Sequence, residues 1–171
     1  MNKKIEKAFA CFTTIIVVLV VVVAIALVGV RLVGLQVFTV LSGSMEPTYQ
    51  TGSLIYVDEV DYKTLKEGDV ITYMLNENTI ATHRIIEVVP NGDDPTVLEF
   101  RTKGDANDIV DGSLVHYKNI IGSPVLAIPK MGYLANYIQT PPGMYIAIAM
   151  GIILVFLIFI PDFFKKSENK K

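Results

Sequence analysis

The most apolar parts of this 171-residue chain lie near its two ends. Residues 8–30 contain no charged side chain. As a helix rising about 1.5 Å per residue they would extend roughly 34 Å, enough for a hydrocarbon core of about 30 Å. The second run, 144–160, reaches that length only if Pro141, Pro142 and Gly143 lie at the membrane interface. The pattern therefore predicts transmembrane helices over 8–33 and 141–161.

Basic residues in the two tails predict an orientation for these spans. Lysines in 1–7 precede the first span and lysines in 162–171 follow the second, so the positive-inside rule places both tails in the cytoplasm. A cleavable signal peptide is the alternative for residues 1–30, but the apolar run is longer than the usual core of about 7–15 residues. We therefore expect a cell-membrane protein with two spans and an extracytoplasmic domain over 34–140.

Between the apolar ends, the pattern is that of short strands. Runs rich in β-branched and aromatic residues alternate with turn signals of Gly, Pro, Asn and Asp. No segment between 34 and 135 shows a sustained 3.6-residue apolar period, and 129–143 is predicted as a short amphipathic connector. The predicted fold class is mainly β, a β ectodomain flanked by an N-terminal and a C-terminal transmembrane helix. Strands are expected over 35–41, 54–60, 69–75, 79–89, 96–102 and 120–128.

The charge of this central region differs from that of the whole chain. Its residues 34–143 contain seven Lys or Arg and fourteen Asp or Glu, a net charge of −7, whereas the whole chain has −2. Such an acidic surface argues against nucleic acid as a partner. The single cysteine, Cys11, cannot form an intrachain disulfide and is best read as a small apolar residue, with acylation as the alternative.

A turn of small, hydroxyl-bearing residues contains the first candidate for chemistry. In the segment SGSMEPT, residues 42–48, the side chain of Ser44 is open to an approaching carbonyl. A serine attacks only when a neighbouring base accepts its proton, and the Ser42 hydroxyl could help to stabilise the resulting oxyanion. A turn without chemistry is the alternative, and on the motif alone it is favoured.

Histidine and aspartate follow in the order that a hydrolytic site needs. Histidine in general has an unperturbed pKa of about 6.5, which suits a general base. His83 is therefore a candidate for that role, although a lone strand histidine is more often structural. His116 has no flanking motif and is expected at the surface. Asp105 and Asp111 are candidates to orient the imidazole. With Asp108 they could instead bind calcium, but a calcium-loop pattern is missing, and no tight zinc spacing is present.

Together these motifs resemble those of type I signal peptidases. The segment SGSMEPT is similar to the family's nucleophile box, and GDVI at 68–71 to the box before the base strand. THR at 82–84 is similar to the box in which most bacterial members carry lysine. Histidine there is typical of the Ser-His subclass, found in the endoplasmic reticulum, archaea and SipW-like enzymes. GDANDIVD at 104–111 resembles the last box.

The resemblance implies a role for each matching residue. Ser44 is the nucleophile and His83 the general base, Asp111 orients His83, and Asp105 is a structural or supporting acid. Ser42, together with Met45, belongs to the oxyanion and substrate-binding residues. Which aspartate faces His83 stays open, with Asp111 favoured by its place at the end of the box.

The implied protein is a membrane-bound serine endopeptidase, a signal peptidase I. It cleaves signal peptides from exported preproteins after a small residue, and no metal or cofactor is expected. Its partners are secreted preproteins, the lipid bilayer and, as a possibility, export machinery. Two alternatives remain: a catalytic-like subunit that needs partner subunits, and a membrane-anchored scaffold domain without activity.

Overall fold

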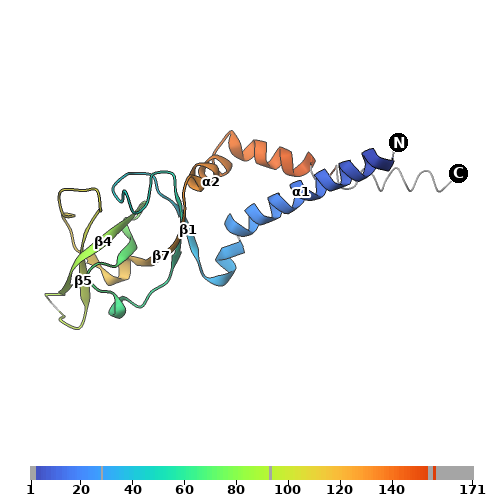
Figure 1. Cartoon of the computed structure of the whole chain (residues 1–171). Coiled ribbons are helices and arrows are strands. Elements are labelled where there is room, and N and C mark those ends of the chain that lie inside the picture. The colour runs from blue at the N-terminus through green and yellow to red at the C-terminus, as the bar shows by residue number, and fades with distance from the viewer. Residues whose placement is uncertain (1–2, 28, 93, 154–155, 157–171) are drawn as a thin grey trace. The chain divides into compact units, whose positions relative to one another are not determined.

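The computed structural model describes residues 3–27, 29–92, 94–153 and 156. The chain divides into two compact units (Figure 1), one made of its two ends, Met1–Gly29 with Asn136–Lys171, and one of its centre, Val30–Ala135. The predicted domain boundaries, with a basic tail over 1–7, a central domain over 34–140 and a second tail over 162–171, stay a prediction.

The unit of the two ends is helical where it is described. Helix α1 (Lys3–Leu27) begins with the charged run KKIEK and continues with apolar residues. A 3-10 helix, η1 (Gly29–Val33), follows it. Near the other end of the chain, residues 143–153 are helical.

The structure corrects the prediction of two flanking transmembrane helices. In the part of the chain that is described, no helix combines the length and the apolar character needed to cross a membrane. The predicted span 8–33 is not one helix, because α1 ends at Leu27 and η1 has a different geometry. The predicted span 141–161 starts in a turn at residues 141–142, and its last part lies outside the described residues.

The localisation derived from those spans is therefore wrong as well. It consisted of a two-span membrane protein with cytoplasmic termini and an extracytoplasmic domain, and no described helix supports the spans on which it rested. The spans were predicted from continuous runs of apolar residues. A span requires more, namely that such a run forms a single helix long enough to cross the bilayer.

The central unit contains a seven-stranded antiparallel sheet, which confirms the mainly β prediction for this part of the chain. The strand order is β1-β2-β7-β3-β4-β5-β6. Adjacent strands exchange backbone hydrogen bonds, with register shifts in β2–β7, β3–β4, β3–β7 and β4–β5. The strands are β1 (Gln36–Thr39), β2 (Leu54–Asp58), β3 (Val70–Asn76), β4 (Thr79–Pro90), β5 (Leu98–Lys103), β6 (Val115–His116) and β7 (Ile120–Ile128).

Side-chain alternation along β3 and β4 creates the main core. Ile71 and Tyr73 of β3 are two residues apart and so lie on the same face of the sheet, together with Ile85 of β4. Ile71 and Ile85 are fully buried and Tyr73 is 2% exposed. In the register of this pair Ile71 lies opposite His83, so the histidine is on the core face as well. The other buried members of the cluster are Leu65, Phe100 and Val115.

Two elements differ from the sequence expectations. The two-residue strand β6 was not predicted, because so short a segment has no alternation to detect. The predicted connector 129–143 contains a regular helix, α2 (Met131–Gln139). Gly132 of this helix lies so close to the sheet that a Cβ atom there would be 2.6 Å from the Ser53 carbonyl oxygen. Close packing of small residues therefore stabilises this short helix.

Candidate active site

Ser44 lies in the loop between β1 and β2, which is closed by backbone hydrogen bonds. The Val40 N–H donates to the Ser53 carbonyl over 2.9 Å, and the Gly52 N–H donates to the Val40 carbonyl over 2.8 Å. Inside the loop, the Glu46 carboxylate accepts bonds from the Thr51 backbone N–H and hydroxyl. The backbone on both sides of Ser44 is therefore fixed.

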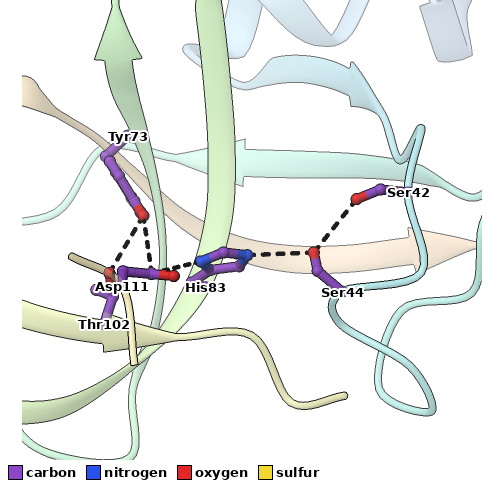
Figure 2. Close-up of polar contacts among 6 residues, drawn as sticks. All are labelled: Ser42, Ser44, Tyr73, His83, Thr102 and Asp111. Atoms are coloured by element: carbon purple, nitrogen blue, oxygen red, sulfur yellow. Dashed lines mark hydrogen bonds and ion pairs between the residues drawn. The ribbon is translucent and has the colours of Figure 1, made fainter. Parts of the chain in front are cut away.

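His83 lies between Ser44 and Asp111 (Figure 2). Its Nε2 atom is 3.1 Å from the Ser44 hydroxyl oxygen, and its Nδ1 atom is 2.6 Å from Oδ2 of Asp111. The side chains of His83 and Asp111 are 13% and 20% exposed, so the group is shielded from water but still reachable. The spacing is within hydrogen-bond reach for a nucleophile, a base and a group that orients the base.

Asp111 is held by two hydroxyl groups in addition to His83. The Thr102 hydroxyl donates to Oδ2 of Asp111 over 2.7 Å, and the Tyr73 hydroxyl lies 3.3 Å from the same atom. Burial raises the pKa of Tyr73 to about 12, although its hydrogen bond with Thr102 acts in the opposite direction. The phenol therefore stays neutral and keeps its proton.

The two residues expected to assist Ser44 lie in different surroundings. The Ser42 hydroxyl oxygen is 3.3 Å from that of Ser44 (Figure 2), so it lies directly beside the Ser44 hydroxyl group. Met45 as a whole residue is only 2% exposed. Little of its side chain or backbone is therefore accessible from outside.

A second polar cluster lies next to the first and is built on Arg84. The Arg84 guanidinium donates to both carboxylate oxygens of Asp105, over 2.8 and 2.6 Å. The Thr48 hydroxyl, from the Ser44 loop, donates to Asp105 over 2.5 Å. The Arg84 hydrogen bonds are the main cause that lowers the pKa of Asp105. Such a bidentate arginine–carboxylate pair fixes the relative orientation of the two side chains and also stabilises their contact.

The loop that contains Asp105 also contacts the backbone of Ser44 directly. The Ala106 N–H donates to the Ser44 carbonyl over 2.9 Å. Gly104 approaches that carbonyl so closely that a Cβ atom there would be 2.5 Å from its oxygen. The segment 104–107 therefore fixes the position of Ser44, and a glycine is needed at 104 for that contact.

The structure brings together some of the predicted residues and separates others. Ser42, Ser44, His83 and Asp111 form one chain of polar contacts, whereas Asp105 pairs with Arg84. His116 is elsewhere, and its Nδ1 atom accepts a bond from the Lys118 backbone N–H. Among the described residues, no group of three or more His, Cys, Asp or Glu side chains could hold a metal ion.

Four contributing residues had no predicted role: Thr48, Tyr73, Arg84 and Thr102. Thr48 and Arg84 were inside quoted motifs, and strand alternation could have placed Arg84 on the face opposite His83. Tyr73 and Thr102 reach Asp111 from β3 and β5. Their roles depend on the order and register of strands, which the sequence pattern alone does not give.

Comparison with known proteins defines the class to which this site belongs. The family model "Signal peptidase, peptidase S26" matches residues 12–124, more than half of the chain. "Signal peptidase I W" of Bacillus subtilis (strain 168) is 51% identical over 83 residues, which are 48% of this chain and 42% of the relative.

Fungal proteins named "Signal peptidase complex catalytic subunit SEC11" match over longer segments. The protein of Fusarium vanettenii is 32% identical over 130 residues, which cover 70% of this chain and 74% of the relative. The protein of Scheffersomyces stipitis is 33% identical over 106 residues, which cover 57% and 61%.

The chain belongs to the signal peptidase family, peptidase S26. This confirms the resemblance seen in the sequence motifs, and with it signal-peptide cleavage by a serine endopeptidase as the class of reaction. The match spans less than half of the length of the Bacillus relative. The residues that act, their steps and the substrates of this chain are therefore matters for a proposal.

Proposed function

We propose that this chain cleaves N-terminal signal peptides from exported preproteins after a small residue, with Ser44 as nucleophile and His83 as general base. The observation that carries the proposal is the position of the His83 ring, with one nitrogen at the Ser44 hydroxyl and the other at the Asp111 carboxylate. Family membership supports the reaction.

Proton positions follow from the chemistry of the three groups. An ionised Asp111 carboxylate can only accept hydrogen bonds, so the proton of the 2.6 Å contact is on Nδ1 of His83. Nε2 is then a free acceptor for the Ser44 proton. Ser44 attacks the carbonyl while His83 takes its proton, and His83 then protonates the departing amine. Water that His83 activates releases the acyl group from Ser44.

The same reasoning assigns a direction to the Ser42 hydroxyl. Because the Ser44 proton is directed to His83, the 3.3 Å contact between the two serines uses the proton of Ser42. Ser42 is thus a donor beside the point of attack, and rotation about its side-chain bonds turns it toward the developing oxyanion. Losing one such donor typically costs about 2.7–4 kcal/mol of transition-state stabilisation.

A cleavage experiment with matched variants tests the proposal. Purified wild-type chain is incubated with a labelled secretory precursor, and the N-terminus of the product is determined. Ser44→Ala, His83→Ala and Asp111→Asn should lose the product, whereas Ser113→Ala, His116→Ala and Asp108→Asn serve as controls. Asp108 and Ser113 are exposed, and the ring of His116 accepts a hydrogen bond from the Lys118 backbone N–H rather than from a group of the candidate site. Cleavage by Ser44→Ala at the wild-type rate would contradict the mechanism.

A subunit that requires partners is the second candidate, favoured by the names of the fungal relatives, which are catalytic subunits of a signal peptidase complex. In this alternative the same residues act, but the chain cleaves only when other subunits or export machinery are present. Labelling by a serine-directed acylating probe separates the candidates from an inactive scaffold. A chain that is labelled at Ser44 but cleaves no precursor alone supports the need for partners, and a chain that is not labelled supports the scaffold.

A further inference from the structure

We propose that Tyr73 is a positioning residue for the reaction: together with Thr102, its hydroxyl group fixes the Asp111 carboxylate in the orientation that His83 needs. The inference rests on the proposed function in that it takes His83 as the general base. Tyr73 and Thr102 both lie outside the sequence motifs from which the site was predicted.

Three donors converge on one oxygen atom of Asp111. Oδ2 is 2.6 Å from Nδ1 of His83, 2.7 Å from the Thr102 hydroxyl oxygen and 3.3 Å from the Tyr73 hydroxyl oxygen. The three donors come from the adjacent strands β3, β4 and β5, whereas Asp111 is in the loop after β5 (Figure 2). The loop is therefore attached to the sheet through this carboxylate and through the Asp111 N–H, which donates to the Thr102 carbonyl over 3.0 Å.

Each of the two hydroxyl groups has one proton to donate. Thr102 donates its proton to Asp111, so its oxygen can only accept in the 3.1 Å contact with the Tyr73 hydroxyl. Asp111 also only accepts. Tyr73 is consequently a donor to either partner, directly to Asp111 or through Thr102. A pKa of about 12 means that the phenol keeps this proton at working pH.

Burial makes these hydroxyl groups hard to replace. Thr102 is fully buried and Tyr73 is 2% exposed, so water has little access to Asp111 from their side. Tyr73 belongs to a core cluster with apolar residues such as Ile71 and Phe100, and its ring lies edge-on to the His83 ring, with 6.4 Å between the centroids. A phenylalanine ring would meet the same packing demand. Packing alone thus does not explain the hydroxyl, whereas the two polar contacts do.

A buried hydroxyl pair on the same strands provides the matched control. Thr72 is the neighbour of Tyr73 on β3 and is fully buried. Its hydroxyl oxygen is 2.8 Å from that of Thr82, the neighbour of His83 on β4. These side chains are on the opposite face of the sheet, because successive strand residues alternate. Thr72→Val therefore removes a buried hydroxyl without touching Asp111.

The first test compares the kinetics of four variants on the labelled precursor. Tyr73→Phe should lower kcat about three- to tenfold with KM unchanged, as expected for one hydrogen bond. Thr102→Val should lower kcat by about ten- to a hundredfold, because its 2.7 Å bond to the Asp111 carboxylate is much shorter than the 3.3 Å contact of Tyr73. Thr102→Ser, which keeps the hydroxyl, should restore most of the rate, and Thr72→Val should match the wild type. Equal kcat in Tyr73→Phe and wild type, or a loss in Thr72→Val as large as in Tyr73→Phe, overturns the proposal.

The second test does not depend on cleavage. The proton between His83 and Asp111 is observed in the far-downfield region of the proton NMR spectrum. The variant His116→Gln is used to assign the signal to His83. Tyr73→Phe should shift or broaden this signal, and Thr72→Val should leave it in place. A signal that is identical in Tyr73→Phe and wild type overturns the proposal. A signal that moves in a chain without any peptidase activity supports the positioning of Asp111 and contradicts the proposed function instead.

Discussion

Two adjacent residues of β4, His83 and Arg84, are each paired with an aspartate from the same loop, and the two pairs differ in what they can do. His83 contacts Asp111 through one ring nitrogen and Ser44 through the other. Arg84 uses its guanidinium on Asp105 and on the Gly68 carbonyl. Because neighbouring strand residues face opposite sides, one short segment serves two separate clusters.

The difference between the pairs lies in proton chemistry. A histidine can exchange a proton near neutral pH, whereas an arginine in a protein remains charged. The His83 cluster can therefore carry out proton transfer, and the Arg84 cluster can only hold parts together. What Arg84 holds is relevant to the reaction, since Asp105 also binds Thr48 of the Ser44 loop. The comparison predicts that the first cluster controls rate and the second controls stability.

The largest expected effect comes from exchanging the two carboxylates for amides. Asp111→Asn should lower kcat by about 10²–10⁴-fold. A carboxylate keeps the His83 proton on Nδ1 and leaves Nε2 free to accept the Ser44 proton, whereas an amide does not favour this tautomer. Asp105→Asn should have a much smaller effect on kcat. Rates on the labelled precursor, measured with thermal unfolding of both variants, check this. Equal losses of kcat in the two variants would show that the clusters are not separate in function.

A smaller effect, in stability, is expected for Arg84→Met. It should lower the free energy of unfolding by about 1–2 kcal/mol, since it removes charge-assisted hydrogen bonds that are partly screened by water. The Arg84 and Asp105 side chains are 34% and 15% exposed. Arg101→Met is the control, because its pair with Glu87 is 41% and 57% exposed and should contribute little. Urea unfolding measures both, and equal losses would contradict a special role of Arg84.

The smallest effect concerns acid stability. The pKa of Asp105 is lowered from 3.8, chiefly by the hydrogen bonds from Arg84. A lowered pKa in the folded state contributes stability at pH values above 3.8, and that contribution is lost as the pH falls through the lower folded value. The stability difference between wild type and Arg84→Met should therefore shrink as the pH falls below 3.8. Urea titrations between about pH 5 and pH 2 test it, and a difference independent of pH would exclude this linkage.

Sequence patterns predicted the local features of the fold well and the helical ends poorly. Strands β1 to β5 and β7 lie within or close to the predicted segments, because alternation and turn residues are local signals. The strand order could not be predicted, since it places β7 between β2 and β3, far from its neighbours in sequence. The predicted spans were wrong because hydropathy measures composition, not whether one suitable helix forms.

The candidate site shows the same division. Ser44, His83 and Asp111 were selected by residue type, order and resemblance, and their catalytic roles stay predictions. The sequence left open which aspartate faces His83, because Asp105 and Asp111 are in one loop. The structure places Asp111 beside His83 and Asp105 beside Arg84, a choice that depends on which face of β4 each aspartate meets.

The sequence by itself determined the family, the mainly β character of the central region and the residue types available for hydrolysis, because these are written in local pattern and motif. Only the tertiary structure decided which residues surround Asp111. Tyr73, Thr102 and His83 come from three strands, and they meet at one oxygen atom only because the sheet sets those strands side by side in a fixed register.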